Sequence, residues 1–171
     1  MGHASFDPRR ILKSLVDHRV DFVVVGGVSA VLQGVPMTTQ DLDIVYAPDA
    51  ENIQRLLLAL ADLEAIYRDL GGRRIVPTTS HLAALGHNLF VTNAGAFDVL
   101  GYVGGTRTTR RYADLLPLTI QVEVPPGFAV FVLDLPTLIE LKEEVNREKD
   151  RAVLPLLRSV LEARQENESR T

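Results

Sequence analysis

Within this 171-residue chain, the pair of residues whose types and spacing best suit chemistry is Asp41 and Asp43, two positions apart. They alternate with Leu42, Ile44 and Tyr46, and this period-two pattern predicts a β-strand. Side chains two positions apart on a strand point to the same face, which places the carboxylates roughly 6 to 7 Å apart. Because two unpaired anions would repel each other there, we expect a hard cation such as Mg²⁺, which prefers carboxylates together with phosphate oxygens. A solvated strand end is the alternative interpretation.

The stretch before the aspartates predicts a strand, a glycine turn and a short helix. Residues 22–25 are β-branched and aromatic, and Gly26-Gly27 ends this run with two residues that tolerate positive φ. Free N–H groups at such a turn and at a helix N-terminus suit phosphate, and the hydroxyl of Ser29 could add a donor. A plain tight turn is the alternative for the glycine pair.

A third carboxylate, Asp98, lies in the second arm of a predicted antiparallel hairpin. Residues 87–92 and 95–100 form the two arms, with turn residues between them. Because the neighbours of Asp98 are apolar, its side chain points to the opposite face from theirs. This can be the face that the paired aspartates share. The alternative role for Asp98 is that of a buried structural hydrogen-bond acceptor.

Apolar periodicity and capping signals predict the elements that must position these groups. Helices are expected to begin at Asp7-Pro8 and at Pro48-Asp49, and two more to occupy residues 134–145 and about 147–164. Strands are expected at 118–124 and 128–133, a loop with one helical turn at 75–86, and a short helix at 106–116. The polar residues 165–171 are expected to fray. Together these elements predict an α+β core.

The predicted helix at 106–116 carries three arginines, Arg107, Arg110 and Arg111. Guanidinium groups near such a phosphate site would suit phosphate oxygens or an RNA backbone. A solvated helix face is the alternative interpretation of this cluster.

Composition limits the classes of protein that the chain can belong to. Its length suits one domain, or one domain with a helical appendage, and 46% hydrophobic residues is ordinary for a globular protein. The formal net charge of -4 does not favour nucleic acid as a partner, although a local basic patch is compatible with it. The absence of cysteine excludes disulfides and thiol catalysis. With no signal-peptide pattern and no long apolar run, we expect a cytoplasmic protein without a membrane partner.

Over nearly its whole length the chain resembles the nucleotidyltransferase (DNA polymerase β-like) superfamily, and within it the small bacterial members similar to AbiEii-type toxin nucleotidyltransferases. The resemblance is carried by Gly26-Gly27, GVPMTTQDLD at 34–43, GAFDVL at 95–100, LIELK at 138–142 and REKD at 147–150. It implies a nucleotidyltransferase fold, a mixed and mostly antiparallel sheet flanked by helices. We expect the core at residues 1–133 and a short helical segment packed on it at 134–171.

The resemblance also implies roles for individual residues. Gly26, Gly27 and Ser29 would hold the phosphates of an NTP such as ATP, and Lys142 would reach phosphate. Asp41, Asp43 and Asp98 would bind Mg²⁺ or Mn²⁺, with Asp98 also the candidate general base, and Lys149-Asp150 would set the later helix against the site. The implied reaction transfers an NMP to a hydroxyl of RNA or protein in a toxin–antitoxin or stress setting, with a cognate antitoxin or other partner protein.

One departure from the superfamily pattern leaves alternatives open. Many members carry an arginine where this chain has Met37, so a phosphate or base contact is either missing or supplied by the arginines at 107, 110 and 111. An inactive module that binds nucleotide or a partner is therefore one alternative function, and a small-molecule transferase of the aminoglycoside kind is another. Lys142 lies in a charged helix, so a surface ion pair competes with ligand contact there.

Overall fold

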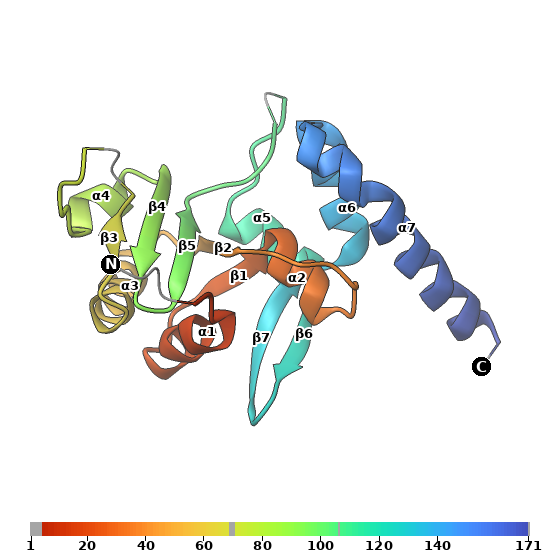
Figure 1. The fold of residues 1–171 in the computed structure, drawn as a ribbon, viewed down its shortest axis with the longest axis horizontal. Coiled ribbons are helices and arrows are strands. Elements are labelled where there is room, and N and C mark those ends of the chain that lie inside the picture. Colours follow the sequence, from red (N-terminus) through yellow and green to blue (C-terminus); the bar gives the residue numbers. More distant parts are fainter. Residues whose placement is uncertain (1–4, 69–70, 106, 171) are drawn as a thin grey trace.

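A seven-stranded sheet forms the centre of the computed structural model, which describes residues 5–68, 71–105 and 107–170 (Figure 1). Its strands are, in spatial order, β3 (Ile66–Tyr67), β4 (His87–Thr92), β5 (Gly95–Leu100), β2 (Asp41–Tyr46), β1 (Phe22–Val25), β7 (Phe128–Leu133) and β6 (Thr119–Val124). Only the neighbours β1–β7 and β2–β5 run parallel. The predicted α+β class and the mixed, mostly antiparallel sheet are confirmed.

Helices flank this sheet, and several begin at the predicted caps. They are α1 (Pro8–Asp17), α2 (Gly26–Leu32), α3 (Ala50–Asp62), α4 (Thr79–Ala83), α5 (Tyr112–Leu115), α6 (Leu135–Val145) and α7 (Glu148–Ser169). The side chains of Asp7, Asp49 and Asp134 each accept the N–H three residues onward, which satisfies a donor that the first helical turn leaves free.

One face of the sheet is closed by helices α1, α3 and α4. Their apolar side chains, including Leu12, Leu56 and Leu82, form a core with Leu42 and Phe97 of the sheet. Helices α5, α6 and α7 build a second core on the opposite face, over β1 and β7. That second face stays open over β5 and β4, where Leu89 is 40% exposed. The uncovered strands become the floor of the pocket described below.

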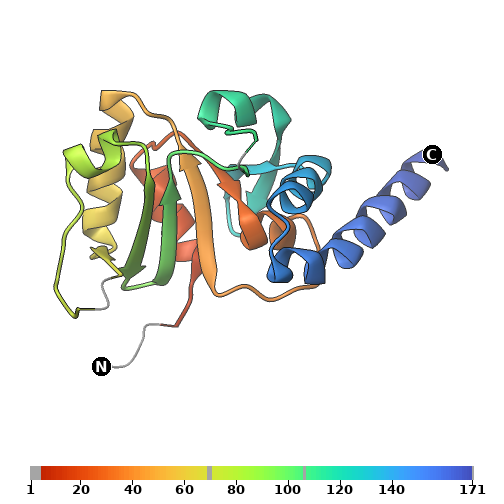
Figure 2. The same ribbon diagram turned by 90° about the horizontal axis from the view of Figure 1, so that it is seen from above.

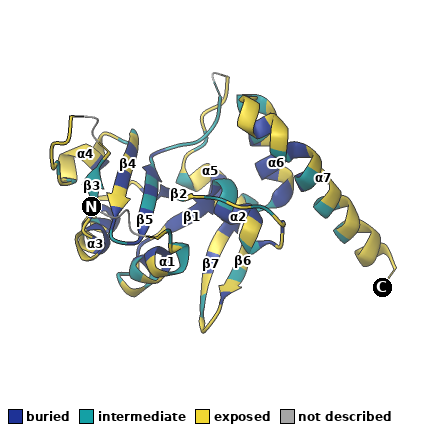
Figure 3. Ribbon diagram, in the orientation of Figure 1, coloured by how far each residue is buried: buried dark blue, intermediate teal, exposed yellow. Residues whose placement is uncertain are grey.

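Helix α7 packs on α6 at its N-terminal end and still contacts the carbonyl of Gln33 through Arg164, and its last turns point away from the sheet (Figures 1 and 2). Its C-terminal half is largely exposed (Figure 3). The prediction that this helix ends at Arg164 is wrong, because it continues to Ser169. The added residues include Gln165 and Glu166, which are good helix formers and need no packed face. Thr171 of the predicted frayed tail lies outside the described residues.

The predicted helix at 106–116 is reduced to Tyr112–Leu115. Thr106 lies outside the described residues. Arg110 forms a β-bridge with Val103, and glycines and β-branched threonines nearby are poor helix formers. The helical turn expected in 75–86 is present as α4. The sequence predicted a turn at Gly26-Gly27 before the helix, but in the structure these two glycines are the first residues of α2.

None of the helices in the part of the chain that the structure describes combines the length and apolar character needed to cross a membrane.

Asn52 of α3 links the helix to the ends of two strands, and it generates a stability prediction. The fully buried side chain donates to the carbonyls of Asp21 and Ala47, both at 2.9 Å, and accepts the Asp21 N–H at 2.7 Å. Asn52→Ala should lower the free energy of unfolding by about 2–4 kcal/mol, because buried groups lose their partners. Urea denaturation measures the change. Gln54→Ala, on the exposed side of the same helix, should cost under about 0.5 kcal/mol. Equal losses would contradict this role.

Candidate active site

Asp41, Asp43 and Asp98 meet at the open part of the sheet. Strand β2 lies between β1 and β5, and its parallel register with β5 places Asp43 directly beside Asp98. One oxygen from each of the three carboxylates lies within 4.8 Å of the other two. The structure therefore brings together the three acidic residues that the sequence singled out. Such a cluster offers only hard oxygen donors, the set that Mg²⁺ or Mn²⁺ prefers.

The electrostatics of Asp43 fit a site for a cation. Burial, together with the neighbouring charge of Asp41, raises the pKa of Asp43 to about 6, although Lys149, Lys142 and Arg147 act to lower it. Its charged form is therefore costly in the protein alone. A divalent cation bound by the three aspartates would remove this cost, so the residues present fit a metal.

The glycine pair lies against the carboxylates, with no room for side chains. Gly26 has φ +66°, and a Cβ on it would overlap the Oδ2 atom of Asp43. A Cβ on Gly27 would stand 2.8 Å from the hydroxyl oxygen of Thr39. Thr39 in turn approaches Asp41, with 3.4 Å between its hydroxyl and a carboxylate oxygen. The glycines thus let the start of α2 approach both aspartates, and they line the same pocket.

A pocket of about 660 Å³ opens over the carboxylates. Strands β2, β4 and β5 form its floor, and the corner between α6 and α7 forms one wall. This corner turns at Asn146, a left-handed residue with φ 53°. It brings Lys142, Arg147 and Lys149 into the lining. The pocket therefore places three cations opposite three carboxylates, which suits a polyphosphate bound with metal.

Asp150 fixes two of these cations. Its side chain is 1% exposed and accepts bonds from Lys142 Nζ at 3.1 Å and from Arg147 Nε at 2.7 Å. Burial acts to raise the pKa of Asp150, but the hydrogen bonds from Arg147 and Lys142 outweigh it and lower that pKa. Lys142 therefore makes a buried ion pair with Asp150 rather than a surface ion pair, and it also lines the pocket, where its contact with phosphate stays a prediction.

Arg68, which sequence analysis missed, contacts the carboxylate of Asp98. It directly follows β3, a strand of only two residues whose pattern is too short to detect in sequence. The Arg68 N–H donates to the carbonyl of Leu89 at 2.9 Å, which aligns the residue with the edge of β4. Its position therefore depends on strand pairing rather than on any local motif.

Four predicted site residues lie elsewhere. Ser29 is fully buried, and its hydroxyl donates to the carbonyl of Leu133 at 2.7 Å, so it does not line the pocket. Arg110 pairs with Glu140 at 2.6 Å. Arg107 and Arg111 are exposed and outside the pocket lining. These arginines do not occupy the place of the missing arginine at Met37, which itself lines the pocket.

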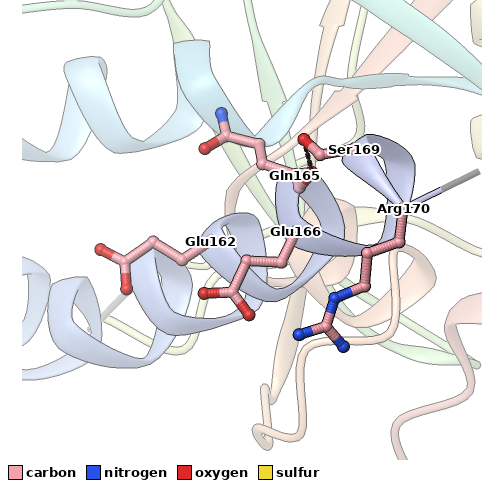
Figure 4. A pocket seen from close by; sticks show the side chains of 5 residues that line it. All are labelled: Glu162, Gln165, Glu166, Ser169 and Arg170. Carbon is pink, nitrogen blue, oxygen red and sulfur yellow. Dashed lines mark hydrogen bonds between the residues drawn. The ribbon is translucent and has the colours of Figure 1, made fainter.

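A second hollow of about 390 Å³ lies along the C-terminal end of α7 (Figure 4). Its five lining residues, Glu162, Gln165, Glu166, Ser169 and Arg170, all come from this one helix. The hydroxyl of Ser169 already has a partner within the helix, since it donates to the carbonyl of Gln165 at 2.8 Å. With one helix supplying every side chain, we assign no ligand to this hollow.

Solved structures with a similar fold include nucleotidyltransferases. A candidate nucleotidyltransferase from Thermotoga maritima matches with a TM-score of 0.55 and 19% identity, over 90% of this chain and 94% of that one. ANT(2'')-Ia in complex with adenylyl-2''-tobramycin matches with a TM-score of 0.56 and 13% identity, over 92% and 89%. The solution structure of the antibiotic-resistance factor ANT(2'')-Ia gives 0.51 and 14%, over 95% and 90%.

No family model matches the sequence, and no curated protein matches it. The structural matches therefore show the nucleotidyltransferase fold, as predicted. Two points stay predictions: that the chain is of the AbiEii-like subtype, and that it divides into a core at residues 1–133 and a helical segment at 134–171.

The raised pKa of Asp43 predicts a pH-dependent gain in stability for Asp43→Asn. An acid whose folded pKa lies above its unfolded value near 3.8 destabilises the fold when ionised. The cost is present above pH 6 and disappears as the pH falls toward 4. In metal-free buffer at pH 8, the free energy of unfolding of the variant should exceed that of the wild type by up to about 2 kcal/mol. Denaturation at pH 8 and pH 4.5 measures it. Asp17→Asn, at an exposed ion pair, is the control, and a gain as large at pH 4.5 as at pH 8 would refute the assignment.

Two glycines with positive φ allow the close approach to Asp43 to be tested. Gly26→Ala and Gly34→Ala share backbone strain, since φ is +66° and +87°, but only the first Cβ meets a neighbour within 4 Å. Gly26→Ala should weaken Mn²⁺ binding at least about tenfold, because Asp43 must move, whereas Gly34→Ala should leave the affinity unchanged. Calorimetric titration with Mn²⁺ decides the point. Equal affinities in the two variants would show that the contact is unimportant.

Proposed function

We propose that this protein is a metal-dependent nucleotidyltransferase, which transfers an NMP from an NTP to a hydroxyl group. The observation that carries the proposal is the cluster of Asp41, Asp43 and Asp98 facing the cations of the α6–α7 corner. The similarity of the fold to nucleotidyltransferases supports it.

The three aspartates would hold Mg²⁺ or Mn²⁺, which would neutralise charge on the phosphates and lower the pKa of the acceptor hydroxyl. Lys142, Arg147 and Lys149 would bind the triphosphate and stabilise the negative charge that grows on the departing pyrophosphate. Asp98, at the edge of the cluster nearest the open strands, would orient the acceptor hydroxyl and accept its proton. Gly26 and Gly27 line the pocket without side chains and would let the phosphates approach the backbone there.

The acceptor and the biological setting are finer proposals. A hydroxyl of RNA or protein, and a toxin–antitoxin or stress role with a partner protein, come from the sequence resemblance. A small-molecule acceptor is the second candidate, since ANT(2'')-Ia carries adenylyl-2''-tobramycin and matches this chain over nearly all of both lengths. Acceptor panels should therefore contain RNA, protein and an aminoglycoside.

Asp43→Asn supplies the test of activity, because we expect it to stay folded. Wild-type protein with Mg²⁺ and each α-labelled NTP should transfer label to an acceptor and release pyrophosphate. Asp43→Asn should reduce the rate at least about 10³-fold, since a metal ligand is lost, while Asp17→Asn retains it. Gel electrophoresis of the labelled products and a pyrophosphate assay measure the two outputs. Undiminished transfer by a folded Asp43→Asn protein would overturn the proposed mechanism, and tight NTP binding without turnover would favour the inactive module.

A further inference from the structure

The three carboxylates of the cluster are not equivalent, because one of them already has a cation beside it. Arg68 makes an ion pair with Asp98, whose side chain is 13% exposed. Asp41 and Asp43 form no ion pair with any of the residues that the structure describes. The metal-free cluster is therefore paired at one end only, where the sheet is open.

Two cations of the α6–α7 corner already have a different partner. Lys142 and Arg147 are held by the buried carboxylate of Asp150, at 3.1 and 2.7 Å. They lower the pKa of Asp43 through space, although they form no ion pair with it in the described structure. Direct pairing with the cluster is thus left to Arg68, which approaches from the opposite side of the pocket.

The sheet itself fixes the position of Arg68. Its N–H donates to the carbonyl of Leu89 at 2.9 Å, and Leu89 is the register partner of Asp98 on the next strand. The preceding residue, Tyr67, is also anchored, since its hydroxyl donates to Oδ1 of Asn88 at 2.6 Å. The guanidinium group therefore reaches across β4 from a backbone that is paired on that side. Such a contact is built by strand pairing and does not depend on a loop.

The Asp98 oxygen that Arg68 contacts keeps the capacity to bind a metal. This oxygen, Oδ1, is buried and has no hydrogen-bond partner of good geometry among the described residues. One oxygen of Asp98 also lies within 4.8 Å of an oxygen of Asp41 and of one of Asp43. A guanidinium group spreads one charge over a planar fork, whereas Mg²⁺ or Mn²⁺ concentrates two charges at one point. The same carboxylate is thus offered to two different cations.

We propose that Arg68 is an internal counter-ion that competes with the divalent cation for Asp98. In the metal-free protein Arg68 occupies Asp98, and it must leave before this carboxylate can take part in metal binding. The ion pair thus holds the metal-free protein in a resting state and limits its affinity for metal. Arg68 acts here as a positioning residue, because its effect passes through Asp98. The inference rests on the metal site of the proposed function, but it does not require transfer of an NMP.

Calorimetric titration with Mn²⁺, without NTP and at about 0.15 M salt, tests this competition. Arg68→Ala should bind Mn²⁺ about tenfold more tightly than the wild type, because the competing charge is gone. Damage to the fold would weaken binding instead. In an Asp98→Asn background, the same substitution should change the affinity by no more than about twofold, since the contested carboxylate is absent. Arg158→Ala, which breaks an exposed ion pair with Glu143 outside the pocket lining, is the matched control and should keep the wild-type affinity.

The possible results separate this inference from the proposed function. Equal or weaker Mn²⁺ binding by Arg68→Ala would overturn the inference and leave the proposed function standing. An equal gain in the Asp98→Asn background would also overturn it, because Arg68 would then act through its charge alone. Tighter binding by Arg68→Ala, with no NMP transfer by the wild type to any acceptor, would support the inference and overturn the proposed function. Absence of Mn²⁺ binding in the wild type and in every variant would overturn both.

Discussion

Repulsion among carboxylates on neighbouring strands is the constraint to which the rest of this structure responds. The parallel pairing of β2 with β5 places Asp43 beside Asp98, and strand periodicity adds Asp41 to the same face. Burial strengthens the repulsion, because charges interact more strongly where water is scarce. The α6–α7 corner brings three cations close enough to moderate it, but the pKa of Asp43 still rises to about 6. The remaining cost is the kind of local instability that binding sites retain for their ligands.

The unequal covering of the sheet gives that cluster both rigidity and access. Helices α1, α3 and α4 cover one face with apolar side chains, which pack against the strands that carry the aspartates. On the other face, α6 and α7 cover β1 and β7 and leave β4 and β5 open. The carboxylates are thus placed where the covered and open parts of that face meet. The site is thus held firmly by the covered part of that face and reached from the open part.

Local patterns in the sequence were sufficient to predict the strands that carry the carboxylates and the positions of most helices. Alternation identified the strands of Asp43 and Asp98, and capping aspartates marked the starts of α1, α3 and α6. Parallel pairing of β2 with β5 could not be predicted, since it joins segments about fifty residues apart. Arg68 was missed for the same reason, because a two-residue strand is defined only by its partner. The helix expected around Arg110 does not extend to that residue. Arg110 forms a β-bridge with Val103, and the poor helix formers nearby favour this over the helix that the apolar spacing predicted.

The turn at Asn146 places the cations of the pocket late in the chain. All three carboxylates lie within the first 98 residues, whereas Lys142, Arg147 and Lys149 follow the whole sheet. A chain emerging from the ribosome can therefore pair β2 with β5 well before its phosphate-binding wall has been made. During synthesis the three carboxylates and Arg68, which contacts Asp98, would be made before the three cations of the corner, so the complete pocket would be one of the last features to form. Order of synthesis thus delays assembly of the site until nearly the whole domain is present.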